Sequence, residues 1–326
     1  MHRIIVLCLA LALDLAIGEP EWLFSRFLPH PVKIIGKAEE ILEWVLRRVM
    51  PRRQRLAGIV LCLVIVAGTY WVTLVAVNAL EGALSHWAAP VLALVLYTAI
   101  ALKGLVSEAA KITGFLKDGQ MDKARVELKS LVGRDTAGLD SQSALKAVIE
   151  SLAENASDGV LAPVFYYLIG GIPLAMAYKA INTLDSMVGY RSEKYRYFGW
   201  ASARLDDLAN LLPSRITGFS LCIASAVTGH GFTGPLKTML RDGRKHPSPN
   251  SGVPMAAMAG ALNVTLGGPA MYGGRLVEKP FIGNGSMPLD AGRAEAAQRL
   301  IILGCLLGAA VMALTVTGLA SVLLHG

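Results

Sequence analysis

The longest apolar stretches of the chain place the strongest limit on its fold. Residues 56–80 and 300–324 contain no charged side chain. At about 1.5 Å of rise per helical residue, each is long enough to cross roughly 30 Å of hydrocarbon. Helices satisfy all of their backbone groups internally, as lipid requires. The chain is therefore predicted to be an all-α, polytopic integral membrane protein, with one membrane-embedded domain over residues 1–326.

Composition agrees with this class of protein. Of the 326 residues, 54% are hydrophobic and 17% are charged, against about 25% charged residues in soluble domains. The net charge of +7 is expected from basic loops on the cytoplasmic side, so no nucleic-acid partner is predicted. The four cysteines lie in apolar runs without a CxxC spacing, which favours core packing over disulfides or a metal site.

Further apolar segments bring the expected number of membrane helices to about four to six. Residues 4–17 could belong to a signal peptide, but Asp14 interrupts the run and residues 16–18 make a poor cleavage site, so a retained first membrane helix is predicted. Residues 88–102 and 208–228 are apolar as well. Residues 159–178 are cut by two prolines and two adjacent glycines. They are expected to form a broken or re-entrant element, whose freed backbone groups must be satisfied by protein or water.

Basic loops indicate which side of the membrane the polar segments face. Residues 18–56 and 103–158 are rich in Lys and Arg, whereas the loop 81–87 has neither, so the first two are predicted to be cytoplasmic. The Gly/Pro-rich loop 229–299, with an amphipathic run at 254–266, is also expected on the cytoplasmic side. Helical spacing recurs three times within the first long polar loop: at 107–117, 121–132 and 141–155.

Three carboxylates share one face of a predicted helix. Glu150, Glu154 and Asp158 are spaced i, i+4, i+8. Like charges so placed repel one another, which calls for a metal ion, a basic side chain or a cationic substrate group. A solvated helix end that stops at Asp158 is the simpler interpretation, and it is preferred for Glu150. Glu154, Asn155 and Asp158 together are predicted to be functional.

Two more groups combine carboxylates with amides. Asn182 and Asp185 are spaced i, i+3, and Asp206, Asp207 and Asn210 repeat the combination. Such oxygen-rich groups suit a hard cation such as Mg²⁺, which keeps waters for exchange with phosphate. Each group alone could be a helix cap. Their coincidence around one apolar core favours a metal–phosphate site.

Arginines close to these groups could bind an anion. Arg191, Arg204 and Arg215 can each grip phosphate in bidentate fashion; the alternative is an anchor belt on the cytoplasmic side. Residues 241–252 carry more cations and a Ser-Pro-Asn-Ser-Gly turn before a helix, which is typical of a phosphate site at a helix N-terminus or of a capped loop. No GxxxxGK[ST] motif occurs, so any ATP is bound without a P-loop.

Long strings of the chain resemble a known family. LPHPVKIIGK near the start, VIESLAENASDGVLAPVFYYLIGG and ARLDDLANLLPSRITG in the middle, and RDGRKHPSPNSG later resemble the adenosylcobinamide-phosphate synthase family of cobalamin biosynthesis. The resemblance covers nearly the whole chain in order. Val253 and Met255 depart from it, since the family commonly has tryptophan and glutamate in this motif.

The resemblance implies an acid–amine ligase in the cytoplasmic membrane, with its active site facing the cytoplasm. Such enzymes use ATP to join the free propionate of adenosylcobyric acid to aminopropanol or its O-phosphate, which gives adenosylcobinamide or its phosphate. Mg²⁺ is the implied cofactor. A second copy of the chain, or later membrane enzymes of cobalamin assembly, are the candidate protein partners.

Under the resemblance, the polar residues take three roles. The predicted catalytic carboxylates are Glu154, Asp158 and Asp185. The predicted metal ligands are Asp185, Asp206 and Asp207. The predicted substrate-binding residues are Asn155, Asn182, Arg191, Arg204, Asn210 and Arg215.

Other functions fit parts of the pattern. A membrane transporter of a small anionic or corrinoid substrate also has broken helices and intramembrane charge, but it would move its substrate without covalent change. A Mg²⁺-dependent transferase of lipid alcohols is hinted at by Asp158-Gly159, but the rest of that motif is missing. A purely structural subunit leaves the acidic groups unexplained.

Overall fold

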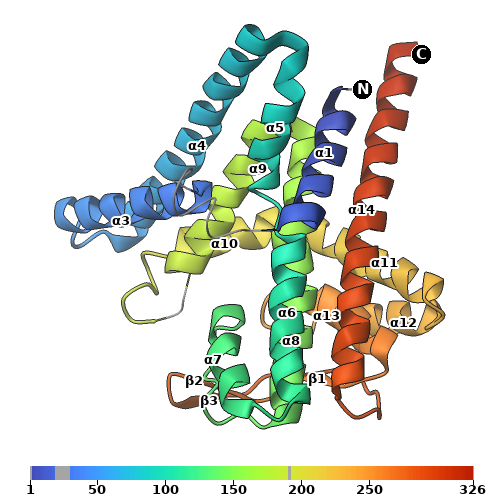
Figure 1. Cartoon of the computed structure of the whole chain (residues 1–326). Coiled ribbons are helices and arrows are strands. Elements are labelled where there is room, and N and C mark those ends of the chain that lie inside the picture. The colour runs from blue at the N-terminus through green and yellow to red at the C-terminus, as the bar shows by residue number, and fades with distance from the viewer. Residues whose placement is uncertain (1, 19–29, 190–191, 326) are drawn as a thin grey trace. The chain divides into compact units, whose positions relative to one another are not determined.

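The computed structural model describes residues 2–18, 30–189 and 192–325, which are almost entirely helical (Figure 1). These residues group into two compact units, each assembled from separate stretches of the chain. The first unit is formed by Met1–Ala101, Ala162–Asn210 and Met312–Gly326, and the second by Leu102–Leu161 and Leu211–Val311. A single membrane-embedded domain over residues 1–326 stays a prediction.

In the first unit, two helices each pack against the same pair of longer helices. α3 and α10 each pack against both α4 and α9, while α1 packs against α5. A 3₁₀ turn, Ser85–Trp87, connects α4 to α5. The helices of this unit are α1 (His2–Ile17), α3 (Pro31–Val49), α4 (Gln54–Leu84), α5 (Ala88–Tyr97), α9 (Ala162–Val188) and α10 (Trp200–Ala209).

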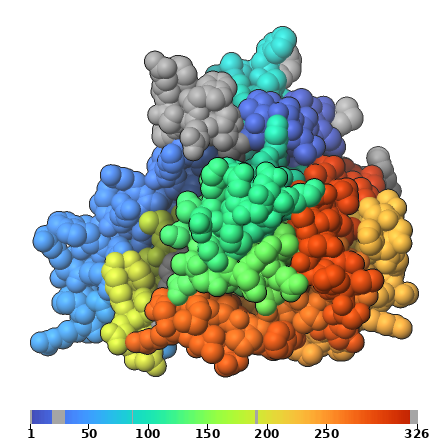
Figure 2. Space-filling view, turned by 60° about the horizontal axis from the view of Figure 1, so that its bottom comes forward, coloured from blue at the N-terminus to red at the C-terminus, as the bar shows by residue number. Residues whose placement is uncertain are grey.

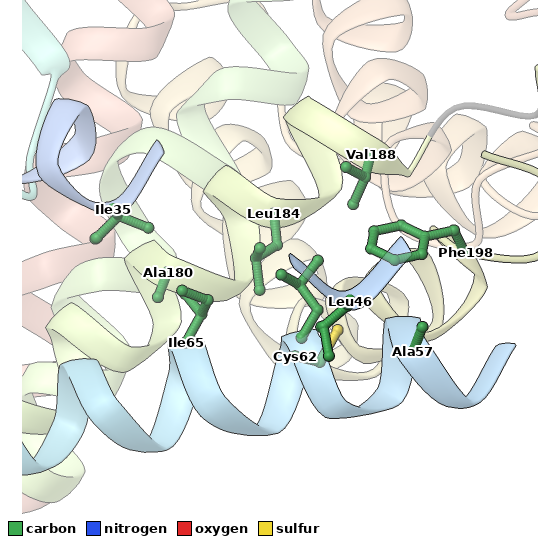
Figure 3. Close-up of a cluster of buried hydrophobic side chains, with 10 residues drawn as sticks. Ile35, Leu46, Ala57, Cys62, Ile65, Ala180, Leu184, Val188 and Phe198 are labelled. Atoms are coloured by element: carbon green, nitrogen blue, oxygen red, sulfur yellow. The ribbon is translucent and has the colours of Figure 1, made fainter. Parts of the chain in front are cut away.

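A buried apolar cluster holds α3, α4 and the end of α9 together (Figure 3). Val188 of α9 lies next to Phe198, which precedes α10. α4 approaches this segment so closely at Gly58 that a Cβ there would overlap the carbonyl oxygen of Phe198. Cys62 of α4 also contacts Ser202 of α10, with 3.1 Å between Sγ and Oγ. This core therefore fixes where α9 ends and where α10 begins.

The predicted break within 159–178 is confirmed inside α9. Gly171 has φ 73° and ψ −167°, and Pro173 follows inside the helix. Proline has no N–H to donate to the preceding turn. The Arg3 guanidinium instead donates to the carbonyl oxygens of Leu168 and Ile169, at 3.4 and 3.3 Å. A re-entrant path for this element stays a prediction.

The second unit contains the three helices that the spacing in 103–158 predicts. α6, α7 and α8 match the predicted ranges to within a few residues, except that α6 starts earlier. Five residues with π-helical hydrogen bonding, Ser157–Leu161, follow α8. The helices of this unit are α6 (Leu102–Lys117), α7 (Met121–Leu131), α8 (Ser141–Ala156), α11 (Leu211–Val227), α12 (Thr233–Asp242), α13 (Gly252–Leu262) and α14 (Ala291–His325) as far as Val311.

The segment 229–299 is more ordered than the loop that the sequence predicts. It contains α12, α13 and two antiparallel strand pairs, of which β2–β3 lies at the surface (orange in Figure 2). The predicted amphipathic run at 254–266 is wrong, because α13 is buried nearly all round between α8, α11 and α12. The strands are β1 (Leu266–Gly267) paired with β4 (Phe281–Ile282), and β2 (Ala270–Tyr272) paired with β3 (Arg275–Val277).

The prediction of an all-α polytopic membrane protein is confirmed. Among the described residues, four helical stretches are long and apolar enough to cross a bilayer. α1, with 16 residues, is shorter than any of them. The four stretches are Gln54–Leu84, Ala88–Lys117, Ser141–Val188 and Ala291–Leu319.

Candidate functional site

The end of α9 and the end of α10 bring predicted amide and carboxylate residues together in the first unit. Asn182 and Asp185 lie one turn apart on α9, and Asp206 lies one turn before Asn210 on α10. Asn210 donates from Nδ2 to Asp206 Oδ2 at 3.0 Å. Its Oδ1 accepts from the hydroxyl of Tyr178, also on α9, at 2.8 Å. Asn210 therefore ties the two helices together and orients Asp206.

Asp206 is the most perturbed carboxylate of this group. Its Oδ1 atom is buried and has no hydrogen-bond partner among the described residues. Burial, and then the negative charge of Asp185, raise the pKa of Asp206 to about 7, although hydrogen bonds from Asn210 and Asn182 favour the ionised form. A cation beside these two carboxylates would stabilise their charged forms.

The donor set here fits Mg²⁺ better than a metal with an all-protein coordination shell. In the part of the chain that the structure describes, no three His, Cys, Asp or Glu side chains are grouped to hold a metal. Mg²⁺ commonly binds through one or two carboxylates and completes its shell with water and substrate phosphate. Asp185 and Asp206, with its open Oδ1, are the residues that would hold it. Asp207 instead lies 3.5 Å from the Arg204 guanidinium.

A pocket of about 570 Å³ lies at the start of α10. Figure 2 shows its two contributing segments, the start of α4 in blue and residues 195–207 in yellow-green, next to one another. Its charged side chains are Arg55, Arg196, Arg204 and Asp207. The other lining residues are Gly189, Tyr195, Tyr197, Gly199, Trp200 and Ala203.

Two glycines bring the wall of this pocket against the carboxylate group. A Cβ on Gly189 would overlap Oδ1 of Asp185, and a Cβ on Gly199 would overlap the carbonyl oxygen of Val188. Gly189 N–H also donates to the Asp185 carbonyl at 2.7 Å. The pocket and the Asp185 carboxylate are therefore separated by no more than one glycine backbone.

The second unit brings two other predicted site residues, Glu154 and Arg215, to the turn before α13. Glu154 of α8 accepts a hydrogen bond from the Ser251 hydroxyl at 2.7 Å. Arg215 of α11 donates to Asn250 Oδ1 at 2.8 Å. The sequence identifies this turn as a motif. It does not identify Ser251 as the hydrogen-bond partner of Glu154, or Asn250 as that of Arg215.

Glu150 is an internal structural residue. It is buried, forms an ion pair with Arg134 and accepts from the backbone N–H of Gly267 at 2.6 Å. The expectation of a solvated helix end is therefore wrong for Glu150, because α7–α8 and β1 cover it. It anchors the first strand pair to α8.

The remaining predicted residues have differing surroundings. Asn155 donates to the carbonyl and hydroxyl of Ser151, both at 3.0 Å, so its amide nitrogen is used within α8. Asp158 lies in the π-helical segment after α8. Arg191 lies outside the described residues. The predicted site is thus divided into one set of residues in each unit.

A buried ion cluster orders the segment after α12. Asp242 is fully buried, and Arg241, Lys245 and the N–H of Gly283 contact its carboxylate at 2.6, 2.7 and 2.9 Å. The hydrogen bond from Arg241 holds the pKa of Asp242 well below its usual range. This cluster therefore fixes the backbone of the RDGRKHPSPNSG motif. Val253, where the resemblance fails, is buried in α13 and serves packing.

Comparisons with known proteins agree with the sequence resemblance. The chain is 47% identical over 302 residues, 91% of each chain, to "Cobalamin biosynthesis protein CobD" of Geobacter metallireducens. The protein of the same name from Pelobacter propionicus is 41% identical over 320 residues, 96% of this chain and 95% of that one. No solved structure matches. The family model "CobD/Cbib protein" matches residues 7–301, and the chain belongs to this family of cobalamin biosynthesis proteins.

Proposed function

We propose that this cobalamin biosynthesis protein is an ATP-dependent acid–amine ligase. Its substrates would be adenosylcobyric acid and aminopropanol or its O-phosphate, and its product adenosylcobinamide or its phosphate. The observation that carries the proposal is that Gly189, in the wall of the arginine-lined pocket, lies against the carboxylate of Asp185, whose charge acts on Asp206. Phosphoryl transfer depends mainly on positioning and on charge neutralisation, and this arrangement supplies groups for both.

The proposed reaction has two steps, and the chain supplies a carboxylate that accepts a proton in the second. A propionate oxygen of the corrinoid attacks the γ-phosphorus of ATP, and ADP leaves. The amine then attacks the carbonyl carbon of the acyl phosphate, inorganic phosphate leaves, and a carboxylate accepts the proton that the nitrogen loses. Bound Mg²⁺ would supply neutralisation of phosphate charge. Asp185 and Asp206 would hold it, with Asp207 as a further candidate ligand that also positions Arg204.

The other predicted residues would bind or act on the substrates. Arg191 and Arg204 would contact phosphate, while Asn182 and Asn210 would orient polar substrate groups. In the second unit, the predicted catalytic carboxylates are Glu154 and Asp158. The substrate-binding residues of the second unit would be Asn155 and Arg215. The site would face the cytoplasm, where ATP is available.

One incubation tests the proposal. Purified protein is mixed with adenosylcobyric acid, aminopropanol phosphate and Mg·ATP, and the corrinoid products are identified by mass spectrometry. The expected result is the amide product with wild type and none with Asp185→Ala, while Asp118→Ala, at an exposed helix end, behaves as wild type. Corrinoid uptake into vesicles without any amide product would instead favour the transporter.

A further inference from the structure

The pocket at the start of α10 contains two arginines, Arg55 and Arg196, to which the proposed reaction assigns no role. Among the described residues, the guanidinium groups of Arg55 and Arg196 make no ion pair and no hydrogen bond, whereas Arg204 has Asp207 at 3.5 Å. One carboxylate thus faces three guanidinium groups. The pocket carries an excess of positive charge that an anion with several negative charges would neutralise.

Aromatic rings hold both of these cations in place. The Arg55 guanidinium lies 5.0 Å from the ring centre of Trp200, and that of Arg196 lies 5.6 Å from the ring of Tyr197. Stacking on a ring leaves the edge of a guanidinium, with its N–H donors, free for a second ligand. The pocket is therefore preorganised to donate hydrogen bonds to anionic oxygen atoms.

Two helix N-termini add to the positive potential. Gly199 is the N-cap residue of α10 and Trp200 its first residue, both line the pocket, and the helix has no side-chain cap. Arg55 lies in the first turn of α4, which also lacks a side-chain cap. The backbone N–H groups of a first turn have no partner within the helix and favour anions.

The size and position of the pocket narrow the choice of anion. A volume of about 570 Å³ falls in the range of roughly 300–1,000 Å³ that is typical for ligands of drug size, and it exceeds what a three-carbon phosphate needs. The basic start of α4, at Arg52, Arg53 and Arg55, places this end of the span on the cytoplasmic side by the positive-inside rule. Nucleoside triphosphates are available there.

We propose that Arg55, Arg196 and Arg204, at the aromatic wall made by Tyr197 and Trp200, bind the polyphosphate of a nucleoside triphosphate. This assignment rests on the proposed function and adds to it that the pocket takes the nucleotide, and that the aminopropanol phosphate binds elsewhere. Asp185, whose carboxylate lies against Gly189 of the pocket wall, would be a residue that holds Mg²⁺, which would neutralise phosphate charge.

Binding to the full-length protein in detergent tests the assignment without any corrinoid. The probes are Mg²⁺ with a non-hydrolysable ATP analogue, inorganic tripolyphosphate and aminopropanol phosphate, each titrated calorimetrically. The nucleotide analogue and tripolyphosphate are expected to compete for one site. Arg55→Gln and Arg196→Gln should each weaken both by about 10- to 100-fold, as expected for loss of a charge-assisted hydrogen bond. Aminopropanol phosphate binding should not change.

A matched control is available three residues away. Arg52→Gln removes an exposed arginine of the same basic segment that does not line the pocket, and it should bind nucleotide as wild type. Arg55→Lys keeps the charge but not the forked geometry, so it should lose less, about threefold to tenfold. Arg55→Lys replaces Arg55→Gln in the binding experiment if Arg55→Gln lowers the yield of monodisperse protein.

Three outcomes would overturn the assignment. The first is nucleotide binding that neither arginine variant changes. The second is a loss confined to aminopropanol phosphate. The third is that, in nanodiscs containing phosphatidylglycerol, the arginine substitutions weaken binding of the anionic lipid and leave nucleotide binding unchanged. The pocket would then be a site for lipid headgroups. Arginine-dependent nucleotide binding without any amide product would refute the ligase and leave the pocket assignment intact. Amide synthesis with an unchanged KM for ATP in both variants would support the ligase and refute the pocket assignment.

Discussion

Asp206 and Asp207 are adjacent in sequence, but their carboxylates have different surroundings. The sequence presents them as one acidic pair and predicts both as metal ligands. Neighbouring residues of a helix point about 100° apart. Asp206 consequently meets Asp185 and Asn210, whereas Asp207 lies beside Arg204 in the pocket. The doublet alone gave no means of separating these two surroundings, because they depend on how α10 packs against α9.

This difference predicts unequal effects of two similar substitutions. Asp206→Asn should lower the rate of amide formation by about 100-fold or more, because it removes the negative charge from a proposed metal ligand. It should also raise the Mg²⁺ concentration needed for half-maximal rate. Asp207→Asn should act mainly on the KM for ATP, through Arg204. Titration of Mg²⁺ and ATP with each variant checks this, and equal Mg²⁺ requirements for the two variants would contradict it.

Glu39 predicts a pH dependence of stability outside the site. It is buried on α3, and burial followed by the charges of Glu43 and Glu40 raises its pKa from 4.5 to about 7. A carboxyl with a raised pKa stabilises the fold while it is protonated. This contribution is complete below about pH 4.5 and is lost as the pH rises through about 7.

Glu39→Gln should remove this loss. The thermal midpoint of the variant, relative to wild type, should therefore be higher at pH 8 than at pH 5. The exposed neighbour Glu40 provides the control, since Glu40→Gln should show a much smaller difference between the two pH values. A variant-to-wild-type difference that shrinks as the pH rises would refute the argument.

At the scale of the element, helices within polar segments were easier to predict than their packing. The spacing in 103–158 correctly predicts α6, α7 and α8, and the Gly-Gly-Pro cluster correctly predicts the break in α9. The burial of α13 was missed, because an apolar helix flanked by turns has the same local pattern at a surface and in a core. Arg55 was missed as a pocket residue because it lies far from α10 in sequence.

Gly189 offers a test of how the pocket wall and Asp185 depend on one another. Gly189→Ala should displace the Asp185 carboxylate, because the new Cβ would overlap its Oδ1. Misplacement of a reacting group by about 1 Å can cost roughly 100-fold in rate, so amide synthesis should fall strongly while expression stays similar. Gly68→Ala, in α4 with nothing near its Cβ position, should leave activity unchanged. Full activity in Gly189→Ala would show that Asp185 does not act from this position.

The break in α9 predicts a loss of stability at Gly171. Its φ of 73° and ψ of −167° lie in a region that is essentially open to glycine alone, and a residue with a Cβ there costs on the order of 1–3 kcal/mol. Gly171→Ala should therefore lower the thermal midpoint in detergent. Arg3→Ala should lower it as well, because the carbonyl groups at the break lose their donor. Midpoints equal to wild type in both variants would mean that the break carries no such cost.

For the whole molecule, composition and apolar length were sufficient to predict a membrane protein, and residue strings to predict its family. The division of site residues between two compact units was not predictable. Each unit combines stretches that are distant in sequence, and such pairings depend on tertiary packing. The segment 229–299 illustrates this in part, since β1 pairs with the distant β4, Leu266 with Ile282, whereas β2 and β3 form a local hairpin.

Membrane orientation can be tested with the two ends of α4. Arg52→Cys should react with a membrane-impermeant maleimide only after cells are permeabilised, because the basic end is expected in the cytoplasm. Ser85→Cys, just after the helix, should react in intact spheroplasts. Wild-type protein sets the background from the native Cys8, which is exposed. The opposite labelling pattern would place the pocket on the outer side, away from ATP.

The glycines at positions 58, 189 and 199 also limit how this pocket can be re-engineered. At each, a side chain would overlap a carbonyl or carboxylate oxygen, so a combinatorial library randomised there should return only glycine among active clones. Positions 196, 197 and 200 carry side chains that face the pocket and can be exchanged without moving the backbone. A change of phosphate-donor preference among related enzymes, or in a selection experiment, should accordingly be encoded at these three positions.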